Sequence, residues 1–274
     1  MSPLCLVDGV EAGFLDPQDR GLHYGDGGFR TLRVADGIAR WWDEQLAKLA
    51  ADAARLDIPS PDAAIWQADL ARLGGRMADG VLKLLLTRGS GPRGYRPPAA
   101  PAPRRIVCYD PTLPGTANGP QTWPGQGLTL RLCSLRLGAQ PRLAGIKHLN
   151  RLENVLARAE WNSPEIHEGL LLDEAGRLIS GVMSNLFLWT GGRLLTPRLD
   201  RCGVAGVARG RLLRLAAATG VPVQETELDL DDLLAADEVM LTNSVVGLVR
   251  VARLERRIWA EPVVSRQFKE LLDA

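Results

Sequence analysis

The segment GLLLDEAGRLISGVMSNLFLWTGGRLLTP, at residues 169–197, is the part of the chain that decides its fold class. Apolar strand-like runs follow one another with only short turns between them, at 173–176 (DEAG) and 191–192 (GG). This pattern predicts a meander, whereas a doubly wound parallel sheet would place a crossover helix between successive strands. The segment therefore favours an α+β fold over a regular βαβ alternation.

The residues on either side continue the irregular mixture of hairpins and helices. Asp-Gly turns between apolar runs predict two hairpins, LCLVDGVE at 4–11 and FRTLRVADGIARWW at 29–42. Apolar periodicity predicts the other elements, which are a helix at 43–56 capped by Asp43, a helix at 61–77, paired strands at 81–88 and 104–110, a strand at 128–137, a helix that begins after Lys147, a helix at 207–219, a strand at 221–228, a short helix near Leu230, and strands at 238–243 and 248–255.

Residues 111–126, PTLPGTANGPQTWPGQ, break every periodicity and predict an interdomain linker. They would separate a small N-terminal α+β domain at 1–110 from a larger C-terminal domain at 127–274, which would carry Lys147. A length of 274 residues with 46% hydrophobic content is enough to give each domain a core.

Charge and composition exclude several classes of function. The 33 basic residues nearly balance the 32 acidic ones, so no overall field would attract nucleic acid or an anionic membrane. The start MSPLCLVDGVEAGF lacks the basic region of a signal peptide and is too short for a membrane span, which predicts a cytoplasmic protein.

The cysteines and histidines predict neither a metal site nor a disulfide framework. The cysteines are far apart without a CxxC pair and are expected to act as small apolar residues: Cys5, Cys108, Cys133 and Cys202. The histidines lack metal-ligand spacing: His23, His148 and His167. With HExxH and GxSxG motifs also absent, zinc hydrolysis and Ser-His-Asp acyl transfer are not expected.

The loop after the strand at 81–88 matches the dinucleotide pattern GxGxxG in RGSGPRG. The residues that follow, YRPPAAPAPRR, cannot form the helix that a dinucleotide site requires, so we reject this interpretation. The loop carries three arginines that would suit carboxylate ligands, or simply form a solvated basic hairpin tip: Arg88, Arg93 and Arg96.

Lys147 lies between the apolar turn LAGI and a predicted helix start. Desolvation and the positive end of a helix both favour the neutral, nucleophilic form of an amine, although a solvated lysine also fits this context. Two nearby segments could receive a phosphate: CGVAGVARGRLL at 202–213 places glycines before a helix, and LTNSVVG at 241–247 offers hydroxyl and amide donors.

Taken together, five segments of the chain resemble one known family. They are LHYGDGGFRTLRV (22–34), TRGSGPRGY (87–95), LAGIKHLNRLENVLARAEW (143–161), GVMSNLFLW (181–189) and LTPRLDRCGVAGVARG (195–210). In this order they closely resemble the aminodeoxychorismate lyases, which are fold-type IV pyridoxal-phosphate enzymes related to the branched-chain and D-amino-acid aminotransferases.

The resemblance implies a two-domain α+β fold, with pyridoxal 5'-phosphate in the interdomain cleft, and a homodimer. It implies conversion of 4-amino-4-deoxychorismate to 4-aminobenzoate and pyruvate in folate biosynthesis. Two alternatives remain open: a D- or branched-chain amino-acid aminotransferase of the same fold, and a degenerate homologue without catalysis. No metal, nucleic acid or membrane partner is expected.

The resemblance also assigns roles to individual residues. Lys147 would form a Schiff base with the cofactor and move protons, assisted by Thr31. The cofactor would be held by Lys48, Ser180, Asn185, Gly206, Val207, Thr242 and Asn243, and the substrate by Arg93, Tyr24 and Arg88. Arg30, next to Thr31, could reach either solvent or substrate, and strand alternation favours solvent.

Two positions depart from the family pattern. Ser180 stands where relatives have a glutamate that pairs with the pyridine nitrogen, and Lys48 where they have a phosphate-binding arginine. Lysine supplies a point charge without the bidentate fork of arginine. A serine hydroxyl would donate to an unprotonated ring nitrogen, which leaves a weaker electron sink. We hypothesise that Ser180 favours elimination over transamination.

Overall fold

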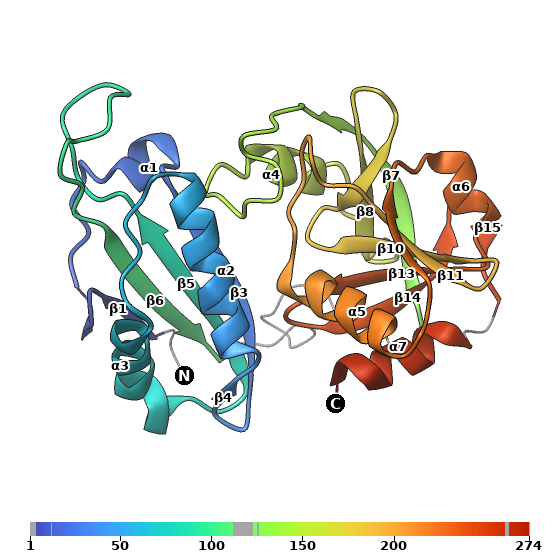
Figure 1. The fold of residues 1–274 in the computed structure, drawn as a ribbon, viewed down its shortest axis with the longest axis horizontal. Coiled ribbons are helices and arrows are strands. Elements are labelled where there is room, and N and C mark those ends of the chain that lie inside the picture. Colours follow the sequence, from blue (N-terminus) through green and yellow to red (C-terminus); the bar gives the residue numbers. More distant parts are fainter. Residues whose placement is uncertain (1–3, 12, 112–122, 125, 261–262, 274) are drawn as a thin grey trace. The chain divides into compact units, whose positions relative to one another are not determined.

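The computed structural model describes residues 4–11, 13–111, 123–124, 126–260 and 263–273. They form two compact units (Figure 1). The first unit holds the described residues before position 112 together with Lys147–Asn150, and the second holds the other described residues. Most of the predicted linker at 111–126 lies outside the described residues, so that assignment stays a prediction.

The first unit is built on a six-stranded antiparallel sheet in the order β2-β1-β6-β5-β3-β4. Its strands are β1 (Leu4–Val7), β2 (Val10–Glu11), β3 (Gly27–Ala35), β4 (Ile38–Ala39), β5 (Gly80–Thr87) and β6 (Arg104–Asp110). Its helices are α1 (Arg20–Tyr24), α2 (Trp42–Arg55), α3 (Ala63–Leu73) and the 3-10 turn η1 (Gly74–Arg76). Both predicted hairpins, β1–β2 and β3–β4, are confirmed.

Strand alternation gives this sheet one core-facing side. Along β5, Leu82, Leu84 and Leu86 are buried, whereas Val81 and Lys83 point to the opposite face. The buried side chains form one cluster with apolar residues of α2 and α3, which therefore cover this face. Figure 1 shows α2 running along the sheet beside β3 and β5.

The second unit contains a mixed nine-stranded sheet in the order β12-β11-β10-β13-β14-β7-β8-β9, with β15 paired to β14. Its strands are β7 (Leu128–Leu137), β8 (Glu168–Asp173), β9 (Leu178–Gly181), β10 (Asn185–Thr190), β11 (Arg193–Pro197), β12 (Val223–Thr226), β13 (Glu238–Asn243), β14 (Gly247–Leu254) and β15 (Arg257–Ile258). Its helices are α4 (Leu152–Arg158), α5 (Val207–Ala218), α6 (Leu230–Ala235) and α7 (Val264–Asp273).

The predicted α+β class is confirmed, but the meander at 169–197 is interrupted. Strand β8 pairs with β9, and β10 pairs with β11, whereas β10 lies next to β13 rather than β9. A bend at 182–184 separates β9 from β10. Pairing with a strand some fifty residues later is non-local, and local periodicity carries no signal of it.

Several local predictions were wrong. Asp43 does not cap α2, because the helix begins one residue earlier with Trp41 as its N-cap, in a left-handed conformation. Helix α4 begins at Leu152 and not directly after Lys147. Helix α7, near the C-terminus, was not predicted at all; its buried face includes Phe268 and Leu272.

The expectation that all cysteines act as free apolar residues was also wrong. Cys5 on β1 lies opposite Cys108 on β6, with 4.2 Å between the Cα atoms, and the two form a disulfide. They are 103 positions apart in the sequence, so only the strand register reveals the pairing. Cys133 and Cys202 are free and buried, as expected of small apolar residues.

Candidate active site

Lys147 is held in the first unit by strand pairing. Its backbone oxygen accepts a hydrogen bond from Phe29 N (2.9 Å), and Leu149 N donates to Gly27 O (3.0 Å), so His148 forms a bridge with Gly28. Strand β4 pairs with β3 only at Val34–Ala35, and residues 147–149 complete the other end of this edge. This pairing explains why Lys147 belongs to the first unit and not, as predicted, to the C-terminal domain.

The side chain of Lys147 is half-buried and lies against the outer face of β3. Its Nζ is 4.5 Å from the centre of the Phe29 ring, which is a cation–π distance. Thr31 is two residues further along β3 and therefore on the same face as Phe29. Because α4 begins five residues after Lys147, the expected influence of a helix N-terminus on this amine is ruled out.

Lys48 and Arg30 share one carboxylate. Both cations pair with Asp52 of α2, and the Asp52 Oδ2 atom also accepts from Lys147 N at 3.1 Å. Arg30 is only 2% exposed, so the expectation that it faces solvent was wrong: it lies on the core-facing side of β3. Burial lowers the pKa of Arg30 to about 10. Burial, with smaller effects from the Arg30 and Arg55 charges, lowers that of Lys48 to about 8.

The first turn of α5 in the second unit provides backbone donors. Gly206 is the N-cap, and no side chain in the described part of the chain caps the helix, so its first N–H groups, from Val207 on, lack a side-chain acceptor there. Asn185 fixes the entry to the helix: its Oδ1 accepts from Gly206 N (3.2 Å) and its Nδ2 donates to Val204 O (2.7 Å). A Cβ at Gly206 would lie 2.5 Å from Asn185 Oδ1, so any larger residue there would have to displace the Asn185 amide from its hydrogen bonds.

Thr242 and Asn243 end strand β13, next to β10 in the sheet. Thr242 is fully buried, and its Oγ1 has no hydrogen-bond partner among the described residues, which is unusual for a buried hydroxyl. The Asn243 side chain is used differently from the prediction: its Oδ1 accepts from Val245 N and Val246 N and shapes the following turn.

Glu168 is a buried carboxyl that the sequence analysis missed. It accepts hydrogen bonds from the backbone N–H groups of Gly169, Val182 and Met183 and from Ser184 Oγ, at 3.0–3.2 Å, and thus holds the bend that precedes Asn185. Burial raises its pKa to about 7 against the opposing effect of these donors. The available signal was a lone carboxylate at the start of the apolar run HEGLLLD.

Ser180 lies on β9 with 7% exposure, just before the same bend. Glu168 does not replace the carboxylate missing at Ser180, because it is fully buried and both of its oxygens are occupied by the bend.

The predicted substrate residues have different roles in the fold. Arg88 is buried, and its guanidinium donates to Asp26 and to the carbonyls of Leu56 and Asp57, so it holds parts of the fold together; its predicted contact with substrate stays a prediction. The Tyr24 hydroxyl accepts from Gly94 N at 3.2 Å and anchors the arginine-bearing loop.

Arg93 is exposed on that loop. Arg20, which was not predicted, is buried and donates to the carbonyls of Gly94, Tyr95 and Arg96, so it fixes the loop from beneath.

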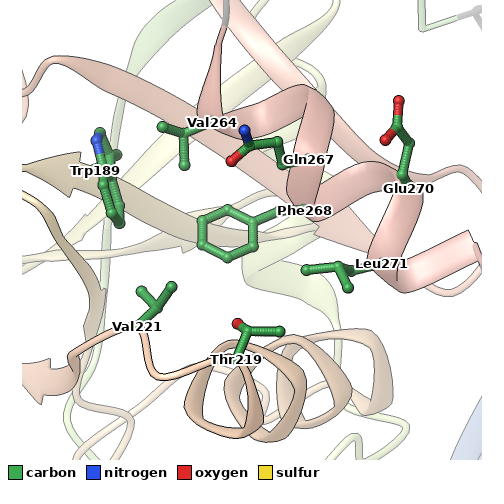
Figure 2. Close-up of a pocket in the computed structure, with 8 residues that line it drawn as sticks. All are labelled: Trp189, Thr219, Val221, Val264, Gln267, Phe268, Glu270 and Leu271. Carbon is green, nitrogen blue, oxygen red and sulfur yellow. The ribbon is translucent and has the colours of Figure 1, made fainter.

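The second unit also has a groove that does not belong to this site. This groove, of about 590 Å³, is lined by Trp189, by Thr219 and Val221, which follow α5, and by side chains of α7 that include Phe268 and Leu271 (Figure 2). None of the predicted site residues lines it.

No cluster of His, Cys, Asp or Glu in the described part of the chain could hold a metal ion, and no described helix is both long and apolar enough to cross a membrane.

Each unit, considered by itself, carries groups of kinds that a phosphorylated cofactor can use. The first presents an amine over an aromatic ring, and the second presents an uncapped helix N-terminus with an unpartnered buried hydroxyl. The model for amino-transferase class IV matches residues 27–254, which include every one of these groups.

The chain belongs to the amino-transferase class IV family.

The chain is similar both to proteins named as lyases and to proteins named as aminotransferases, with different sequence identities. The crystal structure of 4-amino-4-deoxychorismate lyase from Pseudomonas aeruginosa is 46% identical and covers 98% of both chains, with a TM-score of 0.91. Aminodeoxychorismate lyase of Vibrio harveyi is 35% identical over 90% of this chain and 89% of its own. D-alanine aminotransferase of Bacillus licheniformis is 27% identical over 88% and 83%.

Gly206→Ala should disturb the α5 entry of this class IV family member. The added Cβ displaces Asn185, and we expect a loss of roughly 1–3 kcal/mol in the free energy of unfolding measured with urea. Gly210→Ala is the matched control, because its Cβ would meet only Arg214 Nη1 at 3.5 Å. In mid-helix it should stabilise by about 0.5–1 kcal/mol. Equal effects of the two variants would contradict the proposed constraint.

Glu168→Gln should remove a pH dependence of stability. The folded protein holds the Glu168 proton up to pH 7, above its usual value of 4.5, so this stabilisation is complete below pH 4.5 and is lost as the pH rises through 7. Glutamine does not titrate. The stability advantage of the wild type over the variant should therefore shrink by on the order of 3 kcal/mol between pH 5 and pH 8.

Urea unfolding at both pH values measures this change. Glu160→Gln is the control, because hydrogen bonds from Ser134 N and Leu135 N lower the Glu160 pKa against the opposing effect of burial, and it titrates below this window. The idea is wrong if the Glu168→Gln difference is the same at pH 5 and pH 8.

Proposed function

We propose that this chain is a pyridoxal-phosphate-dependent carbon–oxygen lyase that converts 4-amino-4-deoxychorismate to 4-aminobenzoate and pyruvate. The observation that carries the proposal is the 46% identity to the Pseudomonas aeruginosa lyase over 98% of both chains. Similarity to the D-alanine aminotransferase of Bacillus licheniformis is much lower, at 27%. This difference favours the lyase over the aminotransferase, which is the second candidate.

When bound, pyridoxal phosphate supplies an aldehyde for a lysine amine and a conjugated ring that accepts electrons. Lys147 would provide the amine for this aldehyde, and the same amine would take the proton from the substrate carbon that bears nitrogen. Thr31, on the same face of β3 as Phe29, would assist this proton movement with its hydroxyl. Pyruvate leaves from the adjacent ring carbon as the product becomes aromatic.

The phosphate ligands of the proposal come mainly from the second unit. The N–H of Val207 and its neighbours in the first turn of α5, beside Gly206, would bind phosphate oxygens, and Thr242 Oγ1 would gain the partner that it lacks. Asn185 holds this turn in place. Lys48 would add a point charge, and Arg93 would bind a substrate carboxylate.

The proposal includes a homodimer in the cytoplasm. The support for the dimer is an apolar face of α4, where Leu152, Val155 and Leu156 are 59–74% exposed. Three large apolar side chains at i, i+3 and i+4 on one helix are typical of a surface that is covered by another chain. The balanced charge of the chain gives no reason to propose nucleic acid or a membrane as a partner.

The activity and the lysine can be tested in one assay. Wild-type protein supplied with pyridoxal phosphate and aminodeoxychorismate should release 4-aminobenzoate and pyruvate, and Lys147→Ala should lower the rate by roughly 10²–10⁴-fold. Lys83→Ala is the matched control, because Lys83 Nζ also lies over the Phe29 ring, at 5.0 Å. It should leave the rate within about threefold.

Two outcomes would reject the lyase, and a third would reject the role of its lysine. Release of a keto acid from D-alanine or a branched-chain amino acid, without 4-aminobenzoate, would favour the aminotransferase. Failure of the wild type to bind pyridoxal phosphate would favour a non-catalytic homologue. Full activity of Lys147→Ala would remove the assigned role of this lysine.

The choice between elimination and transamination can be tested at Ser180. Ser180→Glu introduces a carboxylate that favours a protonated ring nitrogen, so lyase activity should fall and transamination of amino acids should rise, each by about tenfold or more. Ser180→Ala adds no charge and should keep the ratio of the two activities. Unchanged lyase activity in Ser180→Glu, with brisk transamination by the wild type, would contradict the hypothesis.

A further inference from the structure

We propose that Asp52 is a positioning residue that fixes the backbone of Lys147 against strand β3. The inference rests on the proposed function only in the role that it gives to the Lys147 amine. Neither the sequence pattern nor the comparisons assign a role to Asp52. It is 2% exposed, and it lies on the core-facing stripe of α2, between Leu49 and Ala53.

A carboxylate at such a position requires strong partners, because burial of an unpaired charge is very unfavourable. Asp52 has three, each from a different part of the first unit. Arg30 reaches it from β3, Lys48 from the preceding turn of α2, and the Lys147 backbone N–H from the segment that completes the edge of β3. The carboxylate therefore joins a helix, a strand and the lysine-bearing segment.

The two oxygens of Asp52 have separate tasks. Oδ1 accepts from Lys48, whereas Oδ2 accepts both from Arg30 and from Lys147 N, the latter at 3.1 Å. The backbone oxygen of Lys147 is in turn fixed by Phe29 N. Both polar groups of the Lys147 backbone are thus hydrogen-bonded. Its C=O accepts from strand β3, and its N–H donates to Asp52 on helix α2.

This arrangement fixes where the lysine side chain begins. A reacting group displaced by about 1 Å can lose on the order of 10²-fold in rate, so the origin of a catalytic lysine must be held as firmly as its tip. Arg30 makes Asp52 suited to this task. Among the described residues its guanidinium donates to Asp52, and its Nε is buried without a partner, so Asp52 is the residue that holds Arg30 in place.

Asp52→Asn tests the proposal, with Asp69→Asn as the matched control. Asp69 is also 2% exposed, lies on a helix of the same unit, α3, and pairs with Arg105 Nε at 2.5 Å, and its hydrogen bonds within the described residues do not reach residues 147–149. Both variants remove a buried carboxylate from an arginine and should lower the thermal midpoint. Only Asp52→Asn should loosen the lysine segment.

The first readout needs no cofactor. In hydrogen exchange with mass spectrometry, peptides that cover residues 27–29 and 147–149 should exchange at least tenfold faster in Asp52→Asn than in the wild type, and should be unchanged in Asp69→Asn. The second readout uses added pyridoxal phosphate: the rate of covalent attachment to Lys147, trapped by borohydride reduction, should fall about tenfold or more in Asp52→Asn alone.

A third readout separates positioning from general loss of structure. For 4-aminobenzoate formation, Asp52→Asn should lower kcat by tenfold or more and change KM less than threefold, whereas Asp69→Asn should change neither beyond threefold. If Asp52→Asn does not fold, Asp52→Glu keeps the charge for Arg30 and Lys48 but moves the oxygens, and the same faster exchange at 147–149 is expected.

Equal exchange at 147–149 in the Asp52 and Asp69 variants, or no change in either, would overturn the proposal. So would normal attachment and kcat in Asp52→Asn. If the wild type itself never attaches pyridoxal phosphate, the proposed function fails, while the exchange comparison still decides whether Asp52 holds this segment.

Discussion

The described structure of the first unit depends on how the open edge of β3 is completed. Strand β4 is only two residues long and leaves the Gly27–Phe29 end of the edge without a partner. Residues 147–149 fill that place, and their two hydrogen bonds to β3 bring Lys147 to a sheet from which it is separated by more than a hundred positions in sequence. An exposed strand edge is unfavourable, and here the segment that covers it is also the one that carries the amine.

The N-terminus of α5 in the second unit is shaped by a series of backbone constraints. Glu168 holds the bend after β9, the bend sets the start of β10 at Asn185, and Asn185 fixes Gly206 at the N-terminus of α5. Apart from the Thr242 hydroxyl, the donors offered to a ligand are then backbone N–H groups, which carry no charge and cannot swing away. The side chains in this series shape the site and do not themselves need to meet the ligand.

The sequence predicted those features whose signals are local. Periodicity and turn residues predict the two hairpins with Asp-Gly turns, the helix from Val207, and a buried strand at 81–88 that the structure has at 80–87. The glycines before that helix were likewise visible in the sequence, and Gly206 is its N-cap. Prediction failed where one residue meets another that is distant in the chain. Arg30 looked like a solvent-facing strand residue because its partner Asp52 lies on a helix, and Cys5 looked unpaired because Cys108 is on β6.

The same limit applies to roles within the site. Arg88 was assigned to substrate because it lies in an arginine-rich loop, yet each of its three guanidinium nitrogens donates within the fold, to Asp26 and to two carbonyls after α2. Asp52 was overlooked although it interrupts an apolar helical stripe, which is a local sign of a buried partner. In this chain, a charged residue at a core-facing helix position indicated a specific buried partner more reliably than a charged residue in a loop indicated a ligand contact.

Lysine at position 48, where the family pattern has arginine, has a physical consequence for the charges around Asp52. Arg30, Lys48 and Asp52 together carry a net charge of +1, and Arg30 is the more deeply buried of the two cations. If a phosphate drew Lys48 away, Arg30 would still neutralise Asp52, so no buried carboxylate would be left unpaired. An ammonium on a flexible stem can change partners in this way more readily than a guanidinium held by a bidentate fork. Lys48 binds Oδ1 of Asp52, whereas Arg30 and the Lys147 backbone bind Oδ2, so the contact between Asp52 and the backbone of Lys147 does not run through the position 48 side chain.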